Sequence, residues 1–238
     1  PYASGSMGVL LFLPPLKGQK LFQYTRLHMI NGRMVHCPRP LVGGKWDYNV
    51  ACPICDYYNA LWRQIEKLEE KGMQEEADKI KVEARSIKPI ERYYYNAIVR
   101  KFIDEKGVEH TNVGPKILSV GKLLHKKIIT AIIGSENEEK IGDITHPKNG
   151  YDFVIRIEVT TGKDNFPKYD ASGFARESSA LGTPDEVKQW MSTLHDLPAL
   201  RELKAVEDLE IELAKHRGLI AEETPGFDID KFDAKYRK

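Results

Sequence analysis

The three cysteines of this chain fall within one short stretch, and their spacing constrains how that stretch can fold. Cys52 and Cys55 form a Cys-Pro-Ile-Cys motif, Cys37 precedes them, and His28 and His36 lie just upstream. A Cys-x-x-Cys pair with one more cysteine and one histidine is the ligand set of a closed, structural zinc site. Three thiols cannot all pair as disulfides, so the motif favours one structural Zn²⁺ ion and indicates a reducing, cytoplasmic setting.

Two other interpretations of the Cys-x-x-Cys motif have less support. The cysteines would be ordinary buried thiols if their spacing were accidental, but all of them lie in the same window. A redox-active pair is typical of a helix start within a βαβ unit, and no such pattern surrounds this motif. The sequence therefore predicts a metal that stabilises the fold, and the function must lie in what that fold displays.

A β-hairpin is predicted directly before Cys37. Residues 21–30 and 33–37 have strand character and are joined by Asn31-Gly32, the strongest short signal for a tight hairpin turn. A two-residue loop fixes the register of the two arms. The expected pairs are Ile30 with Arg33, Met29 with Met34, His28 with Val35 and Leu27 with His36.

This register separates the two histidines. Cross-strand partners share a face and side chains alternate along a strand, so His28 points to the same side as Cys37 and His36 points to the other. A β-bulge at Cys37 would reverse that choice and select His36. We predict that the metal ligands are His28, Cys37, Cys52 and Cys55.

Composition limits the class of protein. The chain has 238 residues, enough for one large domain or two small ones, and its apolar and charged content is typical of a globular protein. No apolar run approaches the length of a membrane-spanning helix, and the run at 8–15 is too short for a signal peptide. Net charge is +1, so any nucleic-acid surface must be local. Because the chain begins at Pro1, we expect a fragment or a processed chain whose native terminal segments are missing.

The order of predicted elements indicates an α+β protein, in which a small antiparallel barrel carries helices. Residues 1–20 have a loop-rich composition. We expect strands at 92–103 and 151–160, and helices at 57–70, 74–87, 116–133, from Pro184 onward and at 198–217. The expected organisation is a core at 1–218, containing a zinc subdomain at about 24–58 and a helical insertion at about 59–88, followed by an extended segment at 219–238.

Aromatic and basic side chains alternate in three places, a pattern typical of proteins that bind single strands. Tyr93-Tyr94-Tyr95 lies in a predicted strand, and the other two clusters are loops. A tyrosine triplet in a strand is also commonly half core and half surface. The basic residues near the triplet are Arg92, Arg100, Lys101, Lys122 and Lys126. The loop residues are Phe166, Lys168 and Tyr169 in one cluster, and Lys45, Trp46 and Tyr48 in the other.

Taken in order, these landmarks resemble the single-stranded DNA-binding (helix-destabilising) proteins of T-even and related tailed bacteriophages. The resemblance runs from about Leu10 to about Gly218. Its landmarks are His28, Asn31-Gly32, Cys37, Cys52-Pro53-Ile54-Cys55-Asp56-Tyr57, Tyr93-Tyr94-Tyr95-Asn96, and Phe166-Pro167-Lys168-Tyr169-Asp170-Ala171-Ser172-Gly173-Phe174. The last segment is similar to the family's Phe-x-x-Tyr-Asp-x-Ser-x-Phe motif.

The resemblance implies an OB-fold core, a zinc subdomain with the ligand set given above, and a basic, aromatic-lined cleft for single-stranded DNA. It implies no catalysis. The DNA-stacking residues carried over are Tyr93, Tyr94, Phe166, Tyr169 and Tyr57. The family's basic N-terminal segment for self-association and its acidic C-terminal tail for replication partners have no counterpart here, and the chain ends in a basic segment.

We therefore expect a sequence-tolerant protein that coats and protects single-stranded DNA during phage DNA replication, recombination and repair, in the cytoplasm of an infected bacterial host. Expected partners are single-stranded DNA, phage replication and recombination proteins, and further copies of the chain along the strand. The alternatives are a single-stranded RNA-binding or scaffold protein on the same fold, or a zinc-dependent nuclease or primase-like factor. The expected DNA contacts are Tyr93, Tyr94, Tyr95, Arg92, Arg100, Lys101, Lys122, Lys126, Phe166, Lys168, Tyr169, Trp46 and Tyr57.

Overall fold

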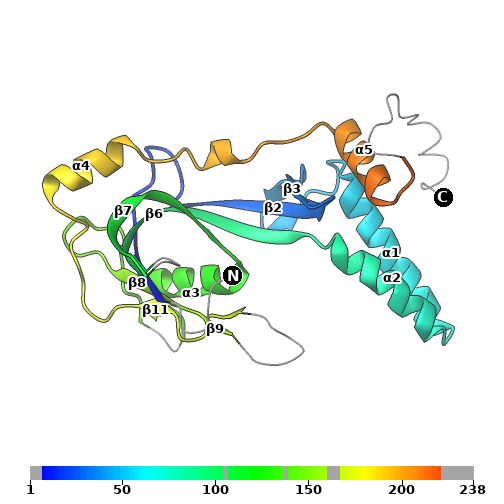
Figure 1. Cartoon of the computed structure of the whole chain (residues 1–238), viewed down its shortest axis with the longest axis horizontal. Helices are drawn as coiled ribbons and strands as arrows, with labels where there is room; N and C mark the ends of the chain where they lie inside the picture. The colour runs from blue at the N-terminus through cyan, green and yellow to red at the C-terminus, as the bar shows by residue number, and fades with distance from the viewer. Residues whose placement is uncertain (1–6, 104–106, 137–138, 160–166, 221–238) are drawn as a thin grey trace. The chain divides into compact units, whose positions relative to one another are not determined.

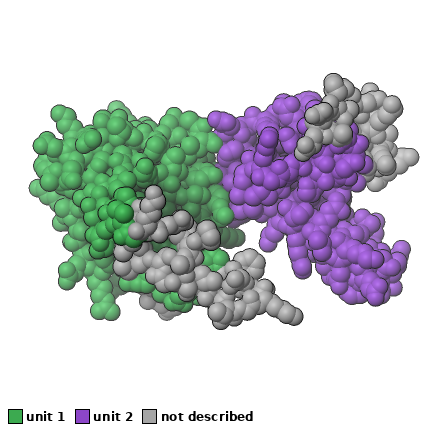
Figure 2. Space-filling model, viewed as in Figure 1, with its two compact units in different colours: residues 1–24, 92–200 green, residues 25–91, 201–238 purple. Residues whose placement is uncertain are grey.

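The chain forms two compact units, coloured separately in Figure 2. Unit 1 comprises residues 1–24 and 92–200, and unit 2 comprises residues 25–91 and 201–238. The computed structural model describes residues 7–103, 107–136, 139–159 and 167–220. Each unit is therefore discontinuous in sequence. The boundaries after residues 24 and 91 fall within strands, and the boundary after residue 200 directly follows a short 3₁₀ turn.

A seven-stranded antiparallel sheet forms the framework of unit 1, and its segments at 25–30 and 33–36 belong to unit 2 (Figure 1). The strand order is β11-β8-β1-β6-β2-β3, and β7 also pairs with β6. Among the described residues this order does not return on itself, so the expected closed barrel is not observed, whereas the α+β class with an antiparallel sheet is. The strands are β1 (Met7–Phe12), β2 (Phe22–Ile30), β3 (Arg33–His36), β6 (Ile90–Ile103), β7 (Glu109–Val120), β8 (Asp152–Arg156) and β11 (Gly173–Phe174).

Strand β1 was not predicted, because its continuous apolar run has no alternation. The structure places it between β6 and β8, where both faces are covered. Phe12 packs with Tyr95 in one core, and Leu11 packs with Ile98 in another. A strand that is buried on both faces reads as an unbroken apolar run.

One face of the sheet in unit 1 is covered by α3 (Lys122–Ile133), whose Leu124 and Ile128 are buried against Tyr95 and other core residues. The expected helix at 116–133 is therefore wrong over residues 116–121, because residues up to Val120 continue β7 and pair with β6. Gly121 has an extended backbone and separates the strand from the helix.

The remaining elements of unit 1 are short. Helix α4 (Pro184–Ser192) begins at a complete capping box formed by Thr183 and Glu186, and its Trp190 packs in the core with Leu11. Two further strands, β9 (Glu158–Val159) and β10 (Pro167–Lys168), pair with each other. A single 3₁₀ turn, η1 (Pro198–Leu200), occupies the start of the region expected to be one long helix.

Unit 2 contains the predicted hairpin. Strands β2 and β3 pair in the register that the Asn31-Gly32 turn predicts, with His28 opposite Val35 and Leu27 opposite His36. Both turn residues have positive φ, as a two-residue hairpin of this kind requires. A second, smaller hairpin follows, formed by β4 (Leu41–Val42) and β5 (Lys45–Trp46).

Three helices complete unit 2: α1 (Pro53–Glu70), α2 (Gln74–Ser86) and α5 (Val206–His216). The first two confirm the predicted helical hairpin and lie side by side (Figure 1). Their buried residues, which include Ile65 and Ala77, share one core with Leu209 and Leu213 of α5. Within the described part of the chain, no helix is long and apolar enough to cross a membrane. Of the segment expected to be extended at 219–238, residues 221–238 lie outside the described residues.

Candidate metal centre and nucleic-acid interface

Three elements of unit 2 carry the predicted metal ligands. His28 lies in β2, and Cys37 directly follows β3. Cys52 is the N-cap of α1, where an extended backbone and Pro53 set the direction of the helix, and Cys55 lies in the first turn. Because residues three apart share one face of a helix, the Cys-x-x-Cys spacing places both thiols on the side of α1 that faces the hairpin.

The ligand atoms lie at distances that a tetrahedral metal ion requires. Sγ of Cys37 is 3.8 Å from Sγ of Cys52 and 3.7 Å from Sγ of Cys55. Nε2 of His28 is 3.5 Å from the sulfur atoms of both Cys52 and Cys55. A tetrahedral zinc ion with Zn–S of about 2.3 Å and Zn–N of about 2.0 Å separates its ligands by about 3.8 Å (S to S) and about 3.5 Å (S to N). The four side chains are buried and their ligand atoms all lie within 4.8 Å of one another, so they can hold one metal ion.

The protonation of the thiols points to the same conclusion. Hydrogen bonds with Cys52 and Cys55 lower the pKa of Cys37, whereas hydrogen bonds with Cys37 and Cys55 raise the pKa of Cys52. The hydrogen bond with Cys37 raises the pKa of Cys55 to about 11. The three sulfur atoms thus shift one another's pKa in opposite directions, and a bound cation would favour the thiolate form that metal ligation requires.

The structure brings His28, and not His36, together with the cysteines. His28 is fully buried, and its Nδ1 atom has no hydrogen-bond partner among the described residues. The ring of His36 faces the other side of the hairpin, where Nδ1 lies 2.8 Å from the hydroxyl oxygen of Thr25. From outside the cluster, the guanidinium of Arg201 donates hydrogen bonds to the carbonyl oxygens of Cys37 and Pro38 and fixes the backbone beside one ligand.

In unit 1 the tyrosine triplet divides between core and surface. Tyr95 is fully buried and packs against Phe12, so the expectation that it contacts DNA is corrected: neither face of its ring is accessible. Tyr93 lies on the same side of β6, and one face of its ring is covered by the ring of His125. His125 was not singled out in the sequence, because a lone histidine on the apolar face of a helix is not a functional signal.

Tyr94 points to the other side of β6. It is half-buried, and burial raises its pKa despite the nearby positive charge of Arg92. Arg92 lies two residues away on the same side of the strand, and its guanidinium reaches Gly121 at the start of α3. Tyr94 and Arg92 thus form an aromatic and basic pair on one side of β6, and Arg92 extends from it to the N-terminus of α3, where Lys122 is exposed.

The other predicted basic residues differ in their freedom to bind phosphate. Arg100 forms an ion pair with Asp152 and donates a hydrogen bond to the carbonyl oxygen of Ala180. Lys101 forms an ion pair with Glu109. Lys126 is exposed, one helical turn after Lys122 on α3. The geometry therefore favours the α3 lysines over Arg100 and Lys101 as phosphate contacts.

The loop that resembles the Tyr-Asp-x-Ser motif is anchored by backbone contacts. The Ser172 hydroxyl accepts from the backbone N–H of Arg156 and donates to the carbonyl oxygen of the same residue. Nζ of Lys127 lies 2.8 Å from the carbonyl oxygen of Asp170. These anchors hold Tyr169 half-buried against the core, next to the exposed Lys168. Phe166, also a predicted DNA contact, lies outside the described residues.

The two predicted aromatic contacts in unit 2 are engaged within the protein. The Tyr57 hydroxyl donates a hydrogen bond to the carboxylate of Glu83, and the guanidinium of Arg217 lies 4.2 Å from the centre of its ring. Trp46 carries the guanidinium of Arg26 on its ring at 4.4 Å. Tyr57 is thus part of the packing between helices of unit 2, and Trp46 is partly exposed on the β4–β5 hairpin.

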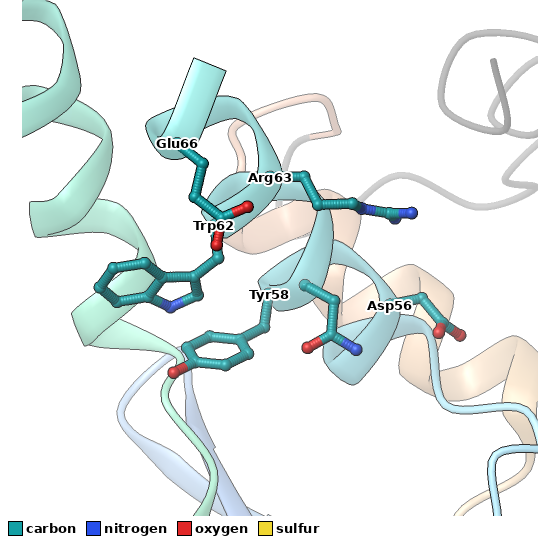
Figure 3. Close-up of a pocket in the computed structure, with 6 residues that line it drawn as sticks. Asp56, Tyr58, Trp62, Arg63 and Glu66 are labelled. Atoms are coloured by element: carbon teal, nitrogen blue, oxygen red, sulfur yellow. The ribbon is translucent and has the colours of Figure 1, made fainter. Parts of the chain in front are cut away.

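A surface pocket of about 560 Å³ lies on α1, and none of the four candidate metal ligands lines it. Figure 3 shows the indole ring of Trp62 and the ring of Tyr58 projecting to the same side of the helix. The rest of the lining mixes the carboxylates of Asp56 and Glu66 with Arg63 and Asn59. This balance of charge does not suit a phosphate backbone, so the pocket is not included in the candidate interface.

The chain was also compared with known proteins. The family described as "gp32 DNA binding protein like" matches residues 31–220, a stretch that includes Cys37, Cys52, Cys55 and the tyrosine triplet. A search among curated proteins finds no match. Since the family match extends over most of the chain and includes three of the four candidate metal ligands, the chain belongs to the gp32 DNA-binding protein-like family.

Proposed function

We propose that this protein binds single-stranded DNA with little sequence preference, and that it coats and protects the strand during phage DNA replication, recombination and repair. The observation that carries this proposal is membership of the gp32 DNA-binding protein-like family over residues 31–220. Proteins of this kind bind a single strand through a basic groove and aromatic rings, and they need no catalytic group. We accordingly propose a non-enzymatic role on an OB-fold-like core.

The pair formed by Tyr94 and Arg92 supports the proposal in unit 1. Tyr94 makes no ring–ring contact within the described residues, so its ring is available to stack on an unpaired base. Arg92 beside it and Lys122 at the start of α3 supply positive charge for the phosphates. A duplex offers no free base faces, and we therefore expect the protein to discriminate against it. Tyr169 and Lys168 are proposed as a second contact of the same kind.

The metal that we propose for the cluster in unit 2 is Zn²⁺. Three thiolates and one imidazole saturate a tetrahedral ion and leave no position for substrate, which supports a structural role. The ion would cross-link the β2–β3 hairpin to the N-terminus of α1. Its contribution is therefore expected in the stability of unit 2 rather than in chemistry on DNA.

Fluorescence anisotropy with one labelled oligonucleotide tests the function directly. The oligonucleotide is titrated first as a single strand and then annealed to its complement, over a series of salt concentrations. We expect tight single-strand binding, weak duplex binding and an affinity that falls steeply as salt rises, since bound phosphates release counterions. Equal or absent binding to both forms would overturn the proposal.

Two further experiments test the alternative functions. An RNA oligonucleotide of the same sequence tests the RNA-binding alternative, and clear preference for RNA over DNA would replace the proposed function by that one. Incubation of labelled single-stranded DNA with Mg²⁺ or Mn²⁺ tests the nuclease alternative. Cleavage of the strand in the presence of the protein, and not in a control without it, would contradict a purely binding role.

A further inference from the structure

Of the aromatic side chains that the structure describes, Tyr48 is the most exposed. It retains 62% of its accessible surface, and the next, Phe102, retains 39% and is stacked on His110. Tyr48 follows the β4–β5 hairpin, close to Lys45 and Trp46. A single exposed aromatic ring is common on protein surfaces, so the significance of Tyr48 depends on what holds its ring in place.

The inner face of the Tyr48 ring is supported by Arg39. The guanidinium carbon lies 4.9 Å from the centre of the ring, within the range of a cation–π contact. The Arg39 side chain is only 3% exposed, and its Nη1 atom is buried without a hydrogen-bond acceptor among the described residues. The Tyr48 ring therefore gives the guanidinium an interaction partner on a side where no carboxylate or carbonyl oxygen accepts a hydrogen bond.

Arg39 is itself fixed by the segments that carry the metal ligands. It follows Cys37 by two residues, and its Nε atom donates to the carbonyl oxygen of Val50, shortly before Cys52. Nη2 lies 2.7 Å from the carboxylate of Asp56, the residue after Cys55. One buried side chain thus ties together the backbone on both sides of the candidate metal site and holds a tyrosine ring facing outward.

We propose that Tyr48 is a base-stacking residue of a second single-strand contact, in unit 2, and that Arg39 is the positioning residue that holds its ring. The ligand is an unpaired nucleotide, whose base stacks on the outer face of the ring while the exposed Lys45 contacts phosphate. A ring already held by a buried guanidinium loses little conformational freedom on binding. The inference rests on the proposed function and adds a site outside the tyrosine triplet.

The competing explanation is that Tyr48 only shields the ion pair between Arg39 and Asp56 from water. The two explanations differ in what the removal of the ring changes. If Tyr48 is a cover, Tyr48→Ala weakens the fold or releases metal faster and leaves DNA affinity unchanged. If Tyr48 is a stacking residue, the same substitution weakens binding and leaves the fold intact.

The test is an anisotropy titration of the zinc-loaded full chain with a labelled oligodeoxythymidylate, alongside thermal melting and the rate of zinc release to a colorimetric chelator. We expect Tyr48→Ala to raise Kd by at least about fivefold, in line with the loss of one stacked base. Tyr48→Phe, which keeps the ring, and Phe102→Ala, which removes the other exposed ring, are expected to bind like the wild type. Melting temperature and zinc release stay unchanged in Tyr48→Ala.

The role of Arg39 is tested by coupling. We expect Arg39→Met to raise Kd, and the double variant with Tyr48→Ala to bind no more weakly than the weaker single variant, because both remove the same contact. If Arg39→Met does not fold, Arg39→Lys, which keeps the charge but loses the planar fork, replaces it in the same cycle. Additive losses would overturn the positioning role.

Two other outcomes would overturn the role of Tyr48 itself. A wild-type protein that binds the oligonucleotide tightly while Tyr48→Ala binds it equally well removes Tyr48 from the interface and leaves the proposed function standing. A wild-type protein that binds no single strand overturns both the proposed function and this inference.

Discussion

The imidazole ring of His125 lies flat on the phenol ring of Tyr93, with ring centroids 3.5 Å apart and planes inclined by 8°. Phe22 meets the same imidazole edge-on, at 4.5 Å between centroids. The hydroxyl oxygen of Tyr95 lies 2.6 Å from Nδ1 of His125. Helix α3 is thus attached to β6 by one aromatic group whose charge depends on pH.

Acidification is expected to weaken this attachment. Burial lowers the pKa of His125 to about 4, below its ordinary value of 6.5. Between these two values the unfolded chain binds a proton that the folded chain does not, so the stability contributed by the neutral ring is present above pH 6.5 and is lost as pH falls toward 4. We expect His125→Phe, which keeps a ring in the stack, to show a flatter dependence of melting temperature on pH in this window. Parallel curves for variant and wild type would contradict the assignment.

Tyr95 and Tyr94 are neighbours with opposite roles. Tyr95→Ala empties a fully buried site and is expected to cost about 3–5 kcal/mol of unfolding free energy. Tyr94→Ala is expected to leave stability nearly unchanged and to weaken single-strand binding by about 1–3 kcal/mol. Urea denaturation and anisotropy of the same samples measure both effects, with Tyr94→Phe as the control that keeps a ring. If Tyr94→Ala and Tyr169→Ala both bind normally, the proposed contacts in unit 1 are wrong.

The histidine of the metal site can be identified with two matched variants. His28→Ala removes a buried ligand and is expected to lower zinc content and melting temperature together, as is Cys52→Ser. His36→Ala removes a ring that contacts Thr25 on the other side of the hairpin, and we expect the variant to retain one equivalent of zinc. Native mass spectrometry counts the metal. Loss of zinc from His36→Ala with retention in His28→Ala would reverse the assignment.

Lys126 and Lys127 are adjacent in α3 but are expected to act differently. Lys126 is exposed, so Lys126→Met should reduce the slope of log affinity against log salt concentration by about 1, the contribution of one phosphate contact. Lys127 bonds the carbonyl oxygen of Asp170, so Lys127→Met should release the loop that carries Tyr169. We then expect Lys127→Met to bind no more weakly when combined with Tyr169→Ala. If both lysine variants show the same salt slope, and if each loses affinity additively with Tyr169→Ala, the two lysines are equivalent.

The metal cluster was predictable because its geometry depends on local rules. Asn31-Gly32 sets the register of the hairpin, the register sets the face of His28, and the Cys-x-x-Cys spacing follows the first turn of a helix. Each step involves residues that are close in sequence. The family resemblance then extended the prediction to the rest of the chain, and the family match agrees with it.

The sequence was less informative where long-range packing decides. Whether a tyrosine of the triplet is core or surface depends on α3, which contributes His125, a residue 30 positions after Tyr95. Strand β1 was missed because it pairs on both edges with strands distant in sequence and its two faces pack in separate cores, which removes the alternation of apolar and polar residues. The helix expected at 116–133 begins only at Lys122, since pairing of β7 with β6 outweighs the helical pattern of its first residues.

The discontinuity of unit 2 has a consequence for biosynthesis. The three cysteines of the candidate metal centre are all translated early, yet the core that encloses them is completed by Leu209 and Leu213 of α5. The side chain of Asn31 is likewise held by the backbone of Glu212. A nascent chain must therefore carry its cysteines without their complete core while residues 92–200 of unit 1 are translated. Capture of metal by the nascent segment would protect these thiols until the last helix arrives.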